Sequence, residues 1–274
     1  MIRVEHLRKQ LGNKQVLSDI SFTVEDGTVF ALVGPNGAGK TTTIRCLTGA
    51  LRADGGLVEL FGEKCNSTNE LHIKERIAVV PEERSVFRNF TATDYLQLWS
   101  RLYPKWDERT FSNFIARYGF DLSQKVESYS IGMKTIFFVG LCVASQAELL
   151  ILDEPTQHLD PTIRLEIMNV LKESANSGKT ILISSHEIFE IEEYATHFGI
   201  IKEGRMIYSD SIDNAKENHR IINRGESLAA SDVIGLVGSS VLVKTKADVG
   251  RFPKLNEIVV GYLTGHRERS LSLK

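Results

Sequence analysis

The stretch Gly34-Pro35-Asn36-Gly37-Ala38-Gly39-Lys40-Thr41-Thr42 decides the fold of this chain, and it directly follows the apolar run Val29–Val33. Its spacing, G-x-x-x-x-G-K-[ST], is that of a loop that binds phosphate groups. Glycines allow successive backbone N–H groups to turn toward phosphate oxygens, Lys40 neutralises terminal phosphates, and the Thr41 hydroxyl can bind Mg²⁺. A helix that begins near Gly39 adds its positive N-terminal end. We therefore predict a phosphate-binding loop between a buried strand and a helix.

The composition excludes a chain dominated by polyanion binding. The 274 residues include 33 Lys plus Arg and 35 Asp plus Glu, which gives a formal net charge of −2. Neither a basic excess for nucleic acid nor an acidic, disordered tail is present. The length allows one large domain or two modest ones with a sizeable buried core.

The cysteines and the apolar runs predict a soluble protein of the cytoplasm. Cys46, Cys65 and Cys142 are scattered without C-x-x-C spacing, which favours free thiols in a reducing compartment over disulfides or a zinc site. The N-terminus has no secretory signal pattern, and no apolar run reaches the ~18 residues of a membrane span. The most apolar stretch, residues 131–144, is interrupted by Lys134.

Alternation of strand-like and helix-like segments predicts an α/β fold. Short strand patterns in residues 2–33 indicate an antiparallel β layer, and residues 77–80, 149–152 and 180–184 read as buried strands. Helices are expected at 40–51, 162–175 and 187–195, and a hairpin at 199–208. In the middle of the chain, Thr91 or Thr93 and Asp107 are candidate helix caps. We predict a P-loop NTPase core with a mostly parallel sheet covered by helices.

A second motif carries the acids that this chemistry needs. The apolar strand at 149–152 ends in Asp153 and Glu154. In a phosphate-loop fold, a parallel neighbouring strand brings such acids beside the phosphates, where Asp153 can hold Mg²⁺ through hard oxygen. Glu154 is then placed to orient or deprotonate an attacking water. Together with the phosphate loop, the motif predicts hydrolysis of a nucleoside triphosphate.

From residue 1 to about 210, the chain resembles the nucleotide-binding subunit of an ATP-binding cassette (ABC) transporter. Residues 129–133, Tyr-Ser-Ile-Gly-Met, resemble the family signature L-S-G-G-Q and precede the acidic strand, as the family order demands. His186 matches the switch histidine, and Leu159-Asp160 matches the D-loop. The resemblance implies an ABC ATPase domain at 1–210 with a helical subdomain at about 90–145, followed by a small α+β appendage at 211–274.

The resemblance also implies ATP and Mg²⁺ as ligands and a composite site. Two subunits would sandwich two ATP molecules head to tail, so that the signature of one covers the phosphates held by the loop of the other. Glu154 and His186 are the implied catalytic residues, and Thr41, Asp153 and Glu82 the implied metal-binding residues. The implied nucleotide-binding residues are Leu11, Val16, Gly34, Asn36, Gly37, Ala38, Gly39, Lys40, Thr41, Thr42, Glu82, Ser130, Gly132, Met133 and Asp160.

Two positions depart from the family pattern. Leu11, ahead of Val16, stands where most cassettes carry an aromatic residue that stacks on adenine. An aliphatic side chain loses stacking that is worth ~1–3 kcal/mol in nucleic-acid systems, so we expect weaker or less base-selective binding. Glu82, after Pro81, replaces the usual glutamine and adds charge beside Mg²⁺ and phosphate. Neither change removes Lys40 or the acids, so we expect hydrolysis to survive.

The main prediction for function is an ATPase subunit that drives a separate membrane permease of a bacterial exporter. Residues 103–107, Tyr-Pro-Lys-Trp-Asp, are similar to a stretch in cassettes of export and antibiotic-response systems. The subunit is expected at the inner face of the membrane, with a second cassette, identical or different, as partner, and residues 84–93 as the permease contact. The alternatives are a soluble cassette that acts on DNA or ribosomes, and a regulatory subunit that binds ATP without turnover.

Overall fold

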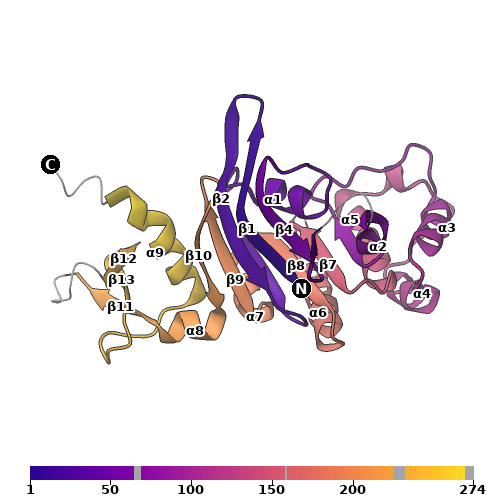
Figure 1. The fold of residues 1–274 in the computed structure, drawn as a ribbon. Helices are drawn as coiled ribbons and strands as arrows, with labels where there is room; N and C mark the ends of the chain where they lie inside the picture. The colour runs from indigo at the N-terminus through magenta and orange to yellow at the C-terminus, as the bar shows by residue number, and fades with distance from the viewer. Residues whose placement is uncertain (65–68, 158, 225–231, 269–274) are drawn as a thin grey trace.

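The computed structural model describes residues 1–64, 69–157, 159–224 and 232–268. A mixed sheet crosses the molecule, with a helical subdomain at one end and a small α+β unit at the other (Figure 1). Within the described residues, no helix is both long and apolar enough to cross a membrane. Cys46 and Cys142 are buried free thiols, as predicted, whereas Cys65 lies outside the described residues.

The N-terminal part of the sheet is the predicted antiparallel layer. Strand β1 (Ile2–Leu11) pairs with β2 (Lys14–Val24) on one side and with β4 (Gly55–Leu60) on the other, and β5 (Glu63–Lys64) extends the edge. This layer is continuous with the rest of the sheet, because β2 pairs in parallel with β10 (Arg205–Ser211).

The remaining strands form the predicted, mostly parallel core. Their order is β10-β9-β3-β8-β7-β6, and only the β9–β10 hairpin is antiparallel. Helices cover this sheet, so strands β3, β6, β7, β8 and β9 are mostly buried, as parallel strands require, whereas β10 is only partly buried. The bounds are β3 Val29–Val33, β6 Ile77–Val80, β7 Leu149–Asp153, β8 Thr180–Ser185 and β9 His197–Lys202.

Helices α1 and α7 are shorter than the sequence patterns predict, whereas α6 extends one residue beyond its predicted range at each end. Helix α1 ends at Leu47 instead of near residue 51, because Gly49 adopts a left-handed conformation with φ of 72°. Asp160 caps α6 by accepting hydrogen bonds from Thr162 N and Ile163 N. The bounds are α1 Lys40–Leu47, α2 Glu70–Lys74, α6 Pro161–Asn176 and α7 Ile188–Tyr194.

The helical subdomain begins at a capping box. Thr91 Oγ1 accepts a hydrogen bond from Asp94 N at 3.2 Å, and the Asp94 carboxylate accepts one from Thr91 N at 2.8 Å. Thr91, rather than Thr93, is therefore the cap, and Asp107 caps the next helix as predicted. The aromatic residues between the helices form the core of this unit. Its elements are α3 Ala92–Leu102, α4 Glu108–Ala116, the 3₁₀ turn η1 Val126–Ser128 and α5 Ile131–Ala144.

The C-terminal unit is an antiparallel sheet with one helix packed on it. Strand β13 (Ser240–Lys244) lies between β11 (His219–Asn223) and β12 (Val233–Val237). Helix α8 (Ile212–Glu217) leads from β10 of the core into the unit, and α9 (Leu255–Glu268) packs on the strands of the unit and contacts α7 and β9 of the core. Buried residues of the unit share one apolar cluster with β3 and β9, so the packing continues across residue 210.

Helix α9 approaches β12 so closely that backbone touches backbone. A Cβ on Gly265 would lie 1.7 Å from the backbone oxygen of Ile234, and one on Gly261 would lie 2.4 Å from the Leu242 side chain. Only glycine permits this contact, because a methyl group would force the helix off the strand.

We predict that Gly265→Ala destabilises the protein by about 1–3 kcal/mol, the usual cost of overpacking a closed contact. The measurement is denaturant unfolding of the purified chain. Val260→Ala on the same helix is the control, because Val260 is exposed and its loss should cost less than about 0.5 kcal/mol. Equal stability of Gly265→Ala and the unmodified protein would contradict this account of the contact.

Candidate functional site: a nucleotide cavity at the carboxyl ends of the core strands

The phosphate-loop motif lies where the sequence predicts it, between β3 and α1. Gly39 has φ of 114°, and a Cβ there would lie 2.6 Å from Leu17 Cδ2, so both the turn and the contact with β2 require glycine. Lys40 is 6% exposed, and its Nζ donates a hydrogen bond to Gly34 O at 2.8 Å. The loop thus presents a buried ammonium group next to the N-terminus of α1.

Register brings the two acids beside this loop. Strand β8 separates β3 from β7, and Asp153 pairs with Ser184 while Val33 pairs with Ser185. The carboxyl ends of these strands therefore meet at one edge of the sheet. Ser184 Oγ donates a hydrogen bond to Asp153 Oδ1 and accepts one from Glu154 N at 3.0 Å.

The Glu154 carboxylate lies between two cationic or potentially cationic groups. Its Oε1 is 3.3 Å from Lys40 Nζ, and its Oε2 is 2.9 Å from His186 Nδ1. A carboxylate can only accept, so His186 Nδ1 donates this hydrogen bond. Glu154 is 4% exposed. A buried carboxylate held at both oxygens has a fixed direction, which is what a general base requires.

The residues present fit a magnesium ion. Thr41 Oγ1 donates to Glu82 Oε2 at 3.1 Å, and the Asp153 carboxylate lies near the same hydroxyl, so three oxygen-bearing side chains converge. Hydroxyl and carboxylate oxygens are the hard donors that Mg²⁺ prefers, and Mg²⁺ usually retains waters and substrate phosphates as its other ligands. Such a site needs no dense cluster of protein ligands.

A cavity of about 240 Å³ opens above these groups. Leu11, 45% exposed at the end of β1, does not line it, whereas Lys14 and Val16 on β2 do. Lys14 was not predicted, although the two-residue period of a strand places it on the same face as Val16. Gly34 does not line the cavity either; its carbonyl oxygen accepts the hydrogen bond from Lys40 Nζ. The lining residues are Lys14, Val16, Asn36, Gly37, Ala38, Gly39, Lys40, Thr41, Thr42, Glu82 and Glu154.

The signature residues lie at a different surface. Ser130 is exposed and caps α5 by accepting from Met133 N at 3.2 Å. Together with Gly132, Met133 and Asp160 it lines a shallow cavity of about 560 Å³ that shares no residue with the nucleotide cavity. A single chain therefore does not bring the two predicted halves of the site together.

A third cavity, of about 440 Å³, lies between the phosphate loop and the C-terminal unit. Residues 35–38 form one wall, and Leu263 and Thr264 of α9 form another. Lys202 Nζ donates to Leu263 O at 2.6 Å and ties α9 to the end of β9. The C-terminal unit thus borders the phosphate loop at residues 35–38.

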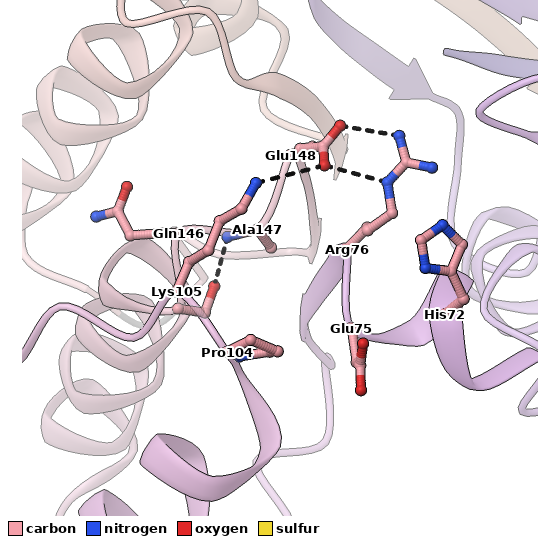
Figure 2. A pocket seen from close by; sticks show the side chains of 9 residues that line it. His72, Glu75, Arg76, Pro104, Lys105, Gln146, Ala147 and Glu148 are labelled. Carbon is pink, nitrogen blue, oxygen red and sulfur yellow. Dashed lines mark hydrogen bonds and ion pairs between the residues drawn. The ribbon is translucent and has the colours of Figure 1, made fainter.

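A further cavity, of about 310 Å³, lies at the amino ends of β6 and β7 (Figure 2). Arg76 pairs with both oxygens of Glu148 at 3.1 and 2.9 Å, and Lys105 Nζ is 4.0 Å from the same carboxylate. Glu75 also lines the cavity, so the two cations face two carboxylates, and these charges do not call for a ligand. Next to this cavity, the Tyr103 hydroxyl donates to Ile77 O at 3.0 Å, and residues 103–107 thus join the helical subdomain to the core.

The fold and the cavity define a P-loop nucleotide-binding protein with the residues for phosphoryl transfer. The sequence model of the family described as "ABC transporter" matches residues 17–157. The chain belongs to this family and is an ABC transporter ATP-binding subunit.

Relatives and solved structures agree with this assignment. The chain is 32% identical to the linearmycin resistance ATP-binding protein LnrL of Bacillus subtilis, over 76% of this chain and 68% of that protein. It is 32% identical to the bacitracin transport ATP-binding protein BcrA of Bacillus licheniformis, over 80% and 72% of the two chains. A solved ATP-binding subunit of an ABC transporter superposes with a TM-score of 0.71 and 26% identity, covering 78% of this chain and 91% of that one.

Asp153 titrates abnormally because of its position. Burial raises the pKa of its carboxyl above the ordinary value of 3.8, hydrogen bonds from Ser184 and Thr41 oppose the shift, and the nearby Glu82 and Glu154 add to it. Between the ordinary and the raised pKa, the native state binds more protons than the unfolded state. The contribution of Asp153 to stability therefore falls as the pH rises through that window.

We predict that Asp153→Asn raises the melting temperature of the nucleotide-free protein at pH 7.5, by at least about 2 °C, because it removes a buried charge. The gain should shrink as the pH is lowered toward the ordinary carboxyl pKa, where both side chains are neutral. The measurement is thermal unfolding across pH. Exposed Asp248→Asn serves as control, and an equal gain there would attribute the effect to net charge instead.

Proposed function

We propose that this chain hydrolyses ATP as one of a pair of cassettes that powers a membrane permease of a bacterial exporter. The observation that carries the proposal is the convergence of Lys40, Asp153, Glu154 and His186 at one edge of the sheet, beside a cavity that Lys40 and Glu154 line. Each of these groups has a distinct task in phosphoryl transfer.

Lys40 and the loop hold the triphosphate, because a buried ammonium and inward N–H groups neutralise its charge. Glu154 accepts the proton of the attacking water, and His186 holds the carboxylate in that direction through Nδ1. Mg²⁺, when bound by Thr41, Asp153 and Glu82, neutralises charge on the transferred phosphoryl group. The buried positions of Lys40 and Glu154 keep competing water away from these charges.

A second cassette supplies the missing half of the site in this proposal. Ser130 and the backbone of Gly132 begin a helix, and a hydroxyl with free N–H groups at a helix start suits an anion. Their exposure on a separate face is consistent with a head-to-tail pair in which each signature covers the partner's phosphates.

The export role and the membrane partner are supported by the relatives. Two further relatives are the lantibiotic transport ATP-binding protein SrtF of Streptococcus pyogenes, 30% identical, and a Nod factor export ATP-binding protein of Burkholderia lata, 31% identical over 94% of this chain. We infer a place at the cytoplasmic face of the membrane through the permease. Phe87, 55% exposed in the segment 84–93, offers an apolar contact for it.

Glu154→Gln is predicted to lower the ATP turnover rate by about 10²- to 10⁴-fold, the range lost with a general base. ATP binding should persist, because the glutamine keeps the shape of the side chain. Phosphate release and equilibrium binding of a fluorescent ATP analogue measure the two quantities. Glu193→Gln, on the exposed side of α7, is the control. Measurable binding without turnover in the unmodified protein would favour the regulatory alternative.

A mixing experiment tests the paired site. Lys40→Ala removes the phosphate grip of one chain, and Ser130→Arg blocks the signature of another, so each variant alone should be inactive. In a head-to-tail pair, mixing them creates one intact site, and ATPase activity should return. The control is Lys40→Ala mixed with Glu154→Gln. Each chain then carries a defect in its own loop-and-acid half, so neither site of the mixed pair is intact. If Ser130→Arg alone hydrolyses ATP as fast as the unmodified protein, the paired arrangement is wrong.

A further inference from the structure

Arg84 connects the loop after β6 to the backbone of both acids. Its Nη2 donates to Glu154 O at 2.8 Å, and its Nη1 donates to Asp153 O at 3.3 Å. Nη1 also donates to the carbonyls of Pro81, at 2.9 Å, and Glu82. One guanidinium therefore joins four carbonyl oxygens from two segments that are about seventy residues apart in the chain.

This arrangement carries a cost. Burial lowers the pKa of Arg84, although the carboxylates of Asp153, Glu82 and Glu154 oppose the shift. Its Nε is buried and has no hydrogen-bond partner among the described residues. A buried unpaired donor is unfavourable, because it loses its hydrogen bonds to water without replacement. The contacts of Nη1 and Nη2 offset this cost, so they fix where the guanidinium lies.

Glu154 needs such support because its backbone is in an unfavourable conformation. Its φ is 49°, in the left-handed region, which is strained for a non-glycine residue. Such a conformation persists only where the surroundings hold it. At Glu154 the N–H is held by Ser184 and the carbonyl by Arg84. The direction of the side chain, toward Lys40 and His186, follows from this backbone.

The same loop reaches the opposite side of the cavity. Glu82 contacts Thr41 at 3.1 Å, two residues before Arg84. Farther along, Phe87 N donates to the hydroxyl of Tyr95 at 2.7 Å, which anchors the loop to the helical subdomain. We expect a shift of that subdomain to displace Arg84 and, through its hydrogen bond, the backbone of Glu154.

We propose that Arg84 is a positioning residue that holds the left-handed backbone of Glu154 and thereby aims its carboxylate at the reacting water. The inference rests on the proposed ATPase function. It assigns to Arg84 an effect on turnover rather than on nucleotide binding, because Arg84 does not line the cavity.

The test compares Arg84→Gln and Arg84→Lys with the unmodified chain. Arg84→Gln should lower kcat at least about tenfold, since a small misplacement of a catalytic group costs up to about 10²-fold. The dissociation constant for ATP should stay within about twofold. Arg84→Lys should recover part of kcat, because an ammonium keeps the charge but cannot grip carbonyls of both segments as a fork does.

Arg220→Gln is the matched control. Arg220 also donates to two backbone carbonyls, Glu217 O at 2.7 Å and His219 O at 2.8 Å, but it lies in the C-terminal unit. Its loss should lower the melting temperature without a comparable fall in kcat. Circular dichroism and thermal unfolding of all variants identify any that fail to fold, and Arg84→Lys then carries the test.

Three outcomes would overturn the inference, and they are distinguishable. Unchanged kcat in Arg84→Gln, while Glu154→Gln is inactive, refutes the positioning role and leaves the ATPase function standing. A tenfold or greater loss of ATP affinity, matching the loss of kcat, assigns Arg84 to cavity structure instead. Absence of turnover in the unmodified protein, despite ATP binding, refutes the proposed function and the inference with it.

Discussion

The ends of parallel strands meet at one edge of the sheet, and the rest of the structure depends on this meeting. Strands β3, β8 and β7 run in register, so Val33, Ser185 and Asp153 end close together. The phosphate loop leaves from the first strand, His186 follows the second, and the acids end the third. No local sequence motif creates this proximity, since the pairing of buried strands imposes it.

Pairing of opposite charges offsets the cost of burying charged side chains at this edge of the sheet. Lys40 and Glu154 are both nearly inaccessible, and their charged groups lie 3.3 Å apart. Removing one partner of such a pair leaves a buried charge uncompensated, which is far more costly than exchanging an exposed pair. Asp153 accepts a hydrogen bond from Ser184, and the nearby Arg84 guanidinium interacts electrostatically with its carboxylate, but burial still dominates its titration. The two acids of the site are therefore compensated unequally.

The sequence predicted the elements of the fold well where the signals were local. Glycine spacing, apolar strands and caps such as Thr91 and Asp107 act within a few residues, and the structure contains them. The family assignment and the α/β core are confirmed. The end of α1 was predicted too late, because the left-handed Gly49 outweighs the apolar pattern that continues to Leu51.

Long-range partners could not be predicted in the same way. Arg84 meets Glu154 only because β6 and β7 are neighbours, and a surface-loop arginine carries no sequence signal of that contact. Leu11 was predicted to contact the adenine base, because it stands ahead of Val16 where most cassettes carry an aromatic residue. In the structure, Leu11 lies outside the cavity and Lys14 lines it. The roles of the individual site residues stay predictions.

The contact of Gly39 with Leu17 has a consequence for how the cavity measures its occupant. Since no side chain on Gly39 separates the loop from β2, the strand that bears Val16 packs directly against the loop that bears Lys40. Backbone packing then sets the distance between the Val16 side of the cavity and the Lys40 ammonium group. A molecule shorter than this distance can contact only one of the two.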